Sequence, residues 1–176
     1  PWMKTAIKLL NSGLDYLDKM EESTLAKRLQ TAINWAIAAA KKLKGRILTE
    51  EEMEEAKERQ QVFEQASNIL PNKERHAIST AEMFNNYLIV QTDINLILES
   101  EKFENFEHYL RLRAAQKLLK GAEKTFTAAE SIYDIKEDDA FILSVSAQLL
   151  APKPTLGEDD AIRLDSIVLS KFGKKL

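Results

Sequence analysis

Two histidines, His76 and His108, are the side chains in this sequence best suited to metal or acid–base chemistry. Glu104 lies four residues before His108, so the two side chains share one face of a predicted helix and could hold a metal ion. A carboxylate-bridged di-metal centre needs a Glu-x-x-His pair on each of two helices, and that spacing is absent here. We therefore expect no metal site, an exposed histidine at position 108, and a polar connection around His76.

Motifs for nucleophilic catalysis and phosphate binding are missing from the sequence. The chain has no cysteine, which excludes disulfides, thiolate metal sites and cysteine nucleophiles. No Gly-x-Ser-x-Gly elbow appears, and Gly121 and Gly157 have no glycine partners at the spacing of a phosphate-binding loop. We expect no catalytic residues and no cofactor. An enzyme or toxin of the helical-bundle type, built on His108 and Glu104, is the least favoured function.

A stripe of basic side chains is the strongest candidate for a binding surface. Residues 108–124 carry five basic groups and a single acid, Glu123. Four of the basic side chains fall within roughly a 60° arc of one predicted helix, opposite its apolar side. Such a stripe could bind a phosphate backbone or an acidic protein, although a solvated helix face has the same composition. The candidate residues for an anionic partner are Arg113, Lys117, Lys120 and Lys124.

Two phenylalanines and an acidic stretch are further candidates for contacts with a protein partner. Phe103 and Phe106 lie outside the apolar seam of their helix, so they either pack against the preceding helix or anchor a partner. Packing is the favoured interpretation. Residues 50–58 carry six glutamates and one lysine, and the dipole at a helix start favours about half of these acids. The acidic stretch and the basic stripe could pair within one molecule or between two.

One apolar seam is expected to position these residues. It repeats at alternating steps of three and four, which keeps one side of a helix against its neighbours. Large and small side chains alternate along it, so that each alanine lets a neighbouring helix approach closely. Because the stepping has no phase change, we predict one continuous helix over 102–133. The seam residues are Leu112, Ala115, Leu119, Ala122, Phe126, Ala129 and Tyr133.

The same spacing predicts helices over the rest of the chain. Capping boxes, in which an N-cap hydroxyl and a glutamate three residues later bond each other's backbone, are expected at Thr49–Glu52 and Ser79–Glu82. The stretch 72–77 between them is expected to be irregular. The other helices are predicted over 3–20, 24–44, 136–151 and 159–172, with the 136–151 helix apolar on nearly all sides and therefore central.

These elements make an all-α fold, a single-domain antiparallel bundle of six or seven helices covering residues 1–176. The seam of the second helix lies 83 residues before the seam at 112–126. One interpretation is an internal duplication of two three-helix halves, 3–73 and 83–154, followed by the C-terminal helix 159–172. The other is that any two heptad helices can be slid into register.

Composition restricts the function further. With 176 residues and a mass of 20.0 kDa, the chain can bury a full core. Its 25 basic and 28 acidic residues give a net charge of −3, without the strong basicity typical of nucleic-acid and anionic-membrane binders. No apolar run is long enough to span a bilayer, and the N-terminus lacks a secretory signal, with Pro1 and Trp2 expected to precede a native start at Met3. We expect a soluble, cytoplasmic protein.

The leading hypothesis for function is a non-catalytic module for protein–protein interaction or assembly, such as an adaptor or a structural subunit. A homodimer is one form of it, because heptad seams and complementary charge patches associate readily. The alternative is a nucleic-acid-binding or regulatory helical protein that uses the basic stripe, whose affinity would fall steeply with salt.

Overall fold

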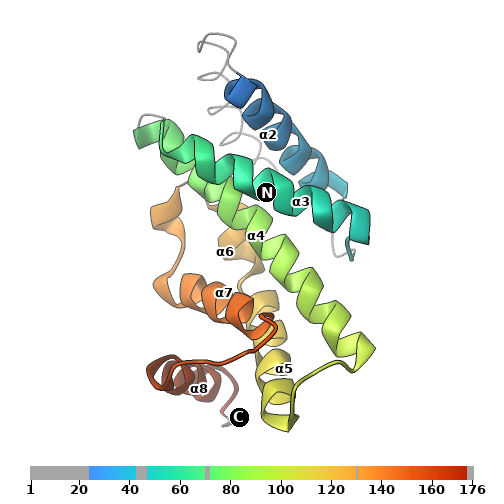
Figure 1. Ribbon diagram of the computed structural model, residues 1–176. Coiled ribbons are helices and arrows are strands. Elements are labelled where there is room, and N and C mark those ends of the chain that lie inside the picture. Colours follow the sequence, from blue (N-terminus) through green and yellow to red (C-terminus); the bar gives the residue numbers. More distant parts are fainter. Residues whose placement is uncertain (1–23, 43–46, 70–71, 130, 174–176) are drawn as a thin grey trace. The chain divides into compact units, whose positions relative to one another are not determined.

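The computed structural model describes residues 24–42, 47–69, 72–129 and 131–173. Within these residues the chain forms seven α-helices and one short 3-10 helix, and no strand (Figure 1). The prediction of an all-α fold with six or seven helices is confirmed. The helix predicted over 3–20 lies outside the described residues. The helices are α2 (Thr24–Lys42), α3 (Glu50–Ser67), α4 (Asn72–Ser100), α5 (Phe106–Gly121), α6 (Glu123–Ala128), η1 (Ile132–Asp134), α7 (Glu137–Leu149) and α8 (Glu158–Phe172).

The chain divides into two compact units. Unit 1 comprises Pro1–Ile89 and Lys124–Ile135, and unit 2 comprises Val90–Glu123 and Lys136–Leu176. The long helix α4 contributes its first part to unit 1 and its last part to unit 2. None of the described helices is long and apolar enough to cross a membrane. The single domain and the internal duplication stay predictions.

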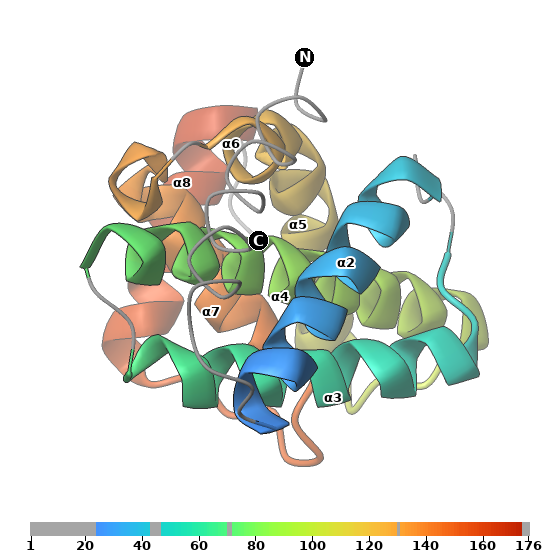
Figure 2. The same cartoon turned by 90° about the horizontal axis from the view of Figure 1, so that it is seen from above.

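The core of unit 1 lies where α2, α3 and α4 meet. Helix α2 lies beside α3 in Figure 1 and runs across α3 and α4 in the view of Figure 2. A buried polar contact accompanies this packing, because the Asn85 amide of α4 donates to the carbonyl oxygen of Ala56 in α3 at 3.0 Å. A second cluster joins the end of α2 to the start of α3. The main cluster contains Leu29, Ala32, Ile33, Ala36, Val62, Phe63, Ala66, Ile78 and Ala81.

The start of α3 is as predicted. The backbone N–H of Glu52 donates to the Thr49 hydroxyl, and the Glu52 carboxylate accepts from the Thr49 backbone, both at 3.2 Å. Leu48 and Met53 on either side of this cap are buried in the same cluster, which is the arrangement of a hydrophobic staple.

The predicted start of α4 is wrong. The helix begins at Asn72 and runs through Ser79 without a break, so residues 72–77 are helical and Ser79 is no N-cap. Thr80, in the same stretch, donates its hydroxyl to the carbonyl oxygen of His76 at 2.8 Å. A hydroxyl that bonds the preceding turn in this way is compatible with a helix interior. The Ser-x-x-Glu pattern therefore occurs here without a helix start.

In unit 2, α7 is the central helix, as predicted. It packs against both α5 and α8. Arg163 of α8 is 3.2 Å from the Asp138 carboxylate and lies over the Phe141 ring at 4.1 Å. Gly173, in the left-handed conformation with φ 66°, ends α8, a position that favours glycine. The buried residues of α7 are Asp139, Ile142, Leu143, Val145, Ser146 and Leu149.

The predicted continuous helix over 102–133 is also wrong. The chain leaves α5 at Ala122 (φ −93°, ψ 2°), forms the short α6, and then forms η1, which has its own capping box at Ser131. After the break, the Phe126 ring stacks on Tyr87 of α4 in unit 1, with centroids 4.9 Å apart. The seam residues up to Ala129 are buried, whereas Tyr133 is 78% exposed. The apolar repeat therefore predicts which side chains are buried up to Ala129, although the chain there is not one continuous helix.

Candidate binding surface on α5

Helix α5 begins at a side-chain cap. Asn105 has extended backbone, and its side-chain oxygen accepts the backbone N–H of His108 at 2.8 Å. Asparagine is among the preferred N-cap residues because it satisfies an amide that the helix leaves without a partner. From this start α5 buries one side in unit 2 and exposes the other. The buried residues are His108, Leu112, Ala114, Ala115, Leu118 and Leu119.

The exposed side carries three of the four predicted basic residues. Arg113, Lys117 and Lys120 are all exposed and lie within roughly a 60° arc of the helix. We call these three residues the cationic face. Among the residues that the structure describes, no carboxylate forms an ion pair with any of them. Like charges on adjacent turns destabilise a helix slightly, so an anionic partner would relieve a repulsion that the described residues leave in place.

Aromatic side chains border the cationic face. Phe106, seven residues before Arg113, points in nearly the same direction from α5 and is 71% exposed. From α8, the ring of Phe172 lies beneath the ammonium group of Lys117 at 5.9 Å, within the range of a cation–π contact. The structure thus brings together basic and aromatic candidates that the sequence placed separately, and adds Phe172. Phe172 lies 55 residues after Lys117 in the sequence, so no local sequence pattern predicts this contact.

The remaining two predicted residues lie elsewhere. Lys124 is exposed but belongs to α6 in unit 1, since the helix that was to carry all four basic residues ends at Gly121. Phe103 is half-buried, and its ring contacts Tyr109 at 4.9 Å between centroids. Phe103 therefore packs within unit 2, whereas the favoured prediction that Phe106 also packs is wrong, because its side chain is 71% exposed.

His108 is buried, and the prediction of an exposed histidine is wrong. The backbone N–H of Glu104 donates to Nδ1 at 2.9 Å, which leaves the proton on Nε2 to bond the carbonyl oxygen of Leu149 at 2.9 Å. Both ring nitrogens are thus engaged: Nδ1 holds the turn before α5, and Nε2 joins the start of α5 to the end of α7. Within the described part of the chain no group of three or more histidine and acidic residues could hold a metal ion. His76, on α4, contacts the exposed ring of Tyr133 edge-on.

Two carboxyl groups in unit 1 form a contact that the sequence does not predict. Burial, together with the charge of Glu64 and a hydrogen bond to it, raises the pKa of Glu82 from 4.5 to about 7. Glu82 lies on α4 and Glu64 on α3, so the pair depends on how the two helices pack. The sequence had assigned Glu82 to a capping box, and no local pattern relates it to a residue eighteen positions earlier.

This pair predicts that unit 1 loses stability as the pH rises. Between pH 4.5 and about 7 the unfolded chain releases the Glu82 proton while the folded chain keeps it, so unfolding becomes easier with rising pH. Because solvent screens a half-buried group, we expect a loss of about 1–2 kcal/mol. Glu82→Gln should remove this part of the pH dependence and be the more stable protein at pH 8. Urea unfolding at pH 5 and pH 8 measures the pH dependence of the free energy of unfolding, with Glu99→Gln as the exposed control. Equal pH dependence in both variants would contradict the pairing.

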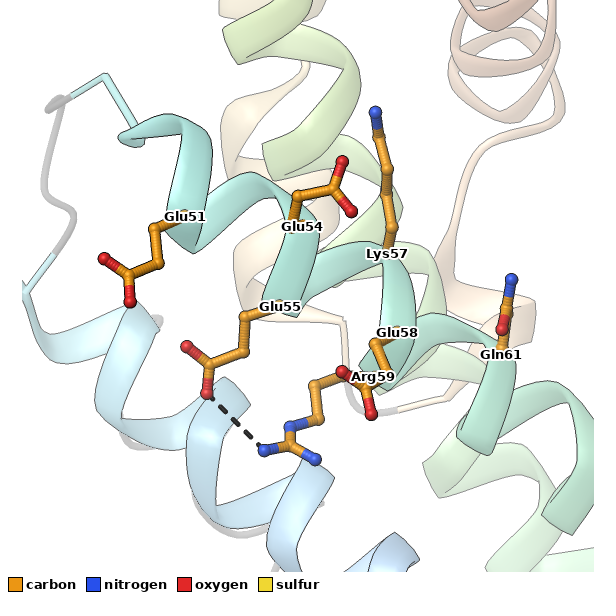
Figure 3. Close-up of a pocket in the computed structure, with 7 residues that line it drawn as sticks. All are labelled: Glu51, Glu54, Glu55, Lys57, Glu58, Arg59 and Gln61. Carbon is orange, nitrogen blue, oxygen red and sulfur yellow. Dashed lines mark hydrogen bonds and ion pairs between the residues drawn. The ribbon is translucent and has the colours of Figure 1, made fainter.

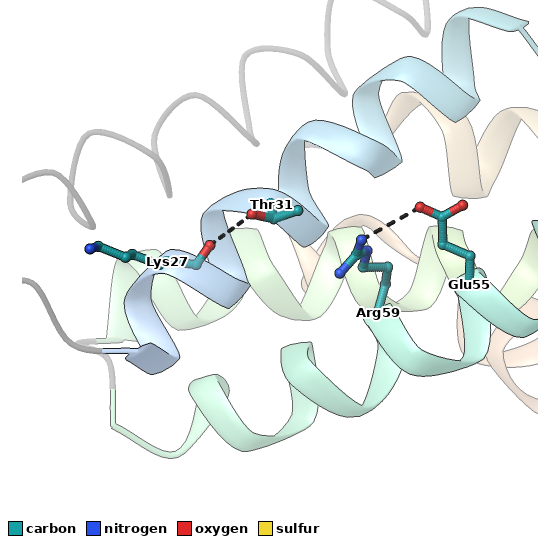
Figure 4. Close-up of polar contacts among 4 residues, drawn as sticks. All are labelled: Lys27, Thr31, Glu55 and Arg59. Carbon is teal, nitrogen blue, oxygen red and sulfur yellow. Dashed lines mark hydrogen bonds and ion pairs between the residues drawn. The ribbon is translucent and has the colours of Figure 1, made fainter.

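The acidic residues of α3 line an open hollow on its surface (Figure 3). Glu55 is paired with Arg59 at 3.5 Å, beside the surface of α2 that carries Lys27 and Thr31 (Figure 4). Glu51, Glu54 and Glu58 are exposed and have no ion-pair partner among the described residues. We call these three residues the acidic face. Lys57 also lines the hollow, so the negative charge of this surface is partly offset.

Comparisons with protein-family models, with curated proteins and with solved structures find no match for this chain.

Proposed function

We propose that the protein is a non-catalytic helical module for protein–protein interaction, an adaptor or assembly subunit, that binds an acidic protein surface through the cationic face of α5. The observation that carries this proposal is the cationic face itself: three exposed basic side chains in one arc, without a carboxylate partner among the described residues. Exposed Phe106 and Phe172 at its border supply apolar contact, and aromatic and arginine side chains are enriched in protein interfaces.

The charge distribution of unit 2 favours a protein over a nucleic acid as the partner. The first turns of α7 and α8 carry exposed acids, including Glu137, Asp138, Glu158 and Asp159. A nucleic acid presents phosphates continuously along its length, whereas a protein can place its acids opposite a few basic residues. The net charge of −3 points the same way. The absence of cysteine fits a protein of the reducing cytoplasm.

One observation favours the alternative function, nucleic-acid binding. Phe106 and Phe172 beside basic side chains resemble the arrangement of aromatic and basic groups that binds single strands by stacking and charge. The two functions differ in their response to nuclease and in how steeply affinity falls with salt, so one experiment separates them.

That experiment is a quantitative pull-down from host extract with the tagged protein, with and without nuclease. The double variant Lys117→Glu/Lys120→Glu should lose a specific protein partner about tenfold or more, because charge reversal replaces attraction by repulsion. Lys153→Glu, an exposed lysine in the loop between α7 and α8, is the matched control and should retain the partner. Retention that disappears with nuclease would establish the alternative, and equal retention by both variants would show that α5 is not the binding surface.

A further inference from the structure

The acidic face of α3 and the cationic face of α5 have matching spacing. Along α3 the acids follow one another at steps of three and then four residues: Glu51, Glu54 and Glu58. Along α5, counted from the C-terminal end, the basic residues also follow at steps of three and then four: Lys120, Lys117 and Arg113. Two helices laid antiparallel therefore bring all three opposite charges together, since side chains at these steps share one helix face.

The two helix surfaces also match beyond the last charged pair, Arg113 and Glu58. Three residues beyond Arg113 and Glu58 the antiparallel register places Leu110 opposite Gln61, and after four more residues it places Phe106 opposite Gln65. Gln61, Gln65 and Phe106 are exposed and Leu110 is half-buried. In this register an uncharged surface of α3 meets the apolar end of the α5 face. The exposed phenylalanine faces no acid, and each of the three basic residues of the cationic face lies opposite a glutamate.

We propose that the cationic face of α5 in one copy of this chain binds the acidic face of α3 in a second copy, with the two helices antiparallel. This inference rests on the proposed function and names its partner. Both faces are exposed, and none of their six charged groups has an ion-pair partner among the described residues, which leaves each face available to the other. Opposite charges at matched positions give orientation and specificity to a contact between helices.

The contact is heterologous, because each copy contributes a different surface to it. A copy bound through α5 still offers its own α3, so association proceeds to longer assemblies unless a ring or a reciprocal dimer closes it. Exposed ion pairs are weak and are screened by salt. The expected behaviour is therefore reversible association that grows with protein concentration and is suppressed at high salt.

Charge-swapped variants of the full chain test this contact. Variant A carries Lys117→Glu and Lys120→Glu, and variant B carries Glu54→Lys and Glu58→Lys. Alone, each presents two faces of like charge and should associate about tenfold or more weakly than the wild type. Mixed, they should associate with each other, because A offers an acidic α5 to the basic α3 of B, and B offers its unchanged α5 to the unchanged α3 of A. A misfolded variant would not regain association on mixing.

Sedimentation equilibrium at low and high salt measures the association, with Lys153→Glu and Glu99→Lys as controls that should behave as the wild type. A wild-type chain that stays monomeric at every concentration, or a mixture that fails to associate, overturns the proposal. If the wild type stays monomeric while a different protein is captured from extract through Lys117 and Lys120, the proposed function stands and only its identification with a second copy fails. If the wild type neither self-associates nor captures another protein through these lysines, both the proposed function and the proposed self-association fail.

Discussion

Replacing Phe126 with alanine is expected to lower the free energy of unfolding by about 3–5 kcal/mol, the usual cost of removing a buried aromatic side chain. Phe126 is 2% exposed and stacks on Tyr87, itself 1% exposed, at 4.9 Å between ring centroids. This contact holds α6 against α4 in unit 1, and no other residue of α6 is as large and as buried. Urea unfolding followed by circular dichroism measures the change.

A matched control and a mutant cycle make this prediction specific. Phe106→Ala removes the same side chain from an exposed site and should change the free energy of unfolding by no more than about 0.5 kcal/mol. A double-mutant cycle with Tyr87→Ala should give a coupling of about 0.5–1.5 kcal/mol, as stacked aromatic pairs do. Absence of coupling would mean that Phe126 does not meet Tyr87 and that the chain does not turn away at Ala122 as described.

His108→Ala is expected to cost about 2–4 kcal/mol, because it leaves a small cavity and removes the side-chain partner of one buried and one partly buried backbone group. These are the carbonyl oxygen of Leu149 and the N–H of Glu104, each now 2.9 Å from a ring nitrogen. Their loss loosens the junction between α5 and α7. The free energy of unfolding in urea is again the measurement.

Two further variants separate a structural role for His108 from a site role. His108→Gln keeps an N–H donor for Leu149 and should recover part of the lost stability, whereas His76→Ala, at a less buried position, should cost no more than about 0.5 kcal/mol. A metal bound to the purified wild type and absent from His108→Ala would contradict the structural role. One ring nitrogen would then bind the metal and not a backbone group.

The fold was predictable where a signal is local. Thr49 with Glu52, and Gly173 at the end of α8, are caps whose residue types directly fit the conformation they adopt. The errors at Ser79 and Ala122 share one cause. A capping pattern can occur inside a helix, and an apolar repeat can cross a helix break, because both report local preference while packing against distant residues decides the outcome. At Ala122 that distant residue is Tyr87, some 35 positions away in the sequence.

The binding surface was predictable in composition but not in extent. Helical spacing placed Arg113, Lys117 and Lys120 on one side of a helix, and that arrangement needs no tertiary information. Lys124 would share this side only if the helix were continuous, and α5 ends at Gly121. Phe172 beside Lys117, and Glu82 beside Glu64, depend on how separate helices pack, which no spacing within one helix reports.

The most direct test of the central claim is site-specific photo-cross-linking from position 117 of the full chain in nuclease-treated host extract. We predict a covalent adduct with protein, either a second copy or another acidic protein, from position 117, and none from position 153 in the exposed loop. A second copy cross-linked through α3 would support both the protein-binding role of α5 and its proposed contact with α3. Equal labelling from the two positions, or adducts that form only when nucleic acid is left intact, would contradict the account of α5 as a protein-binding surface.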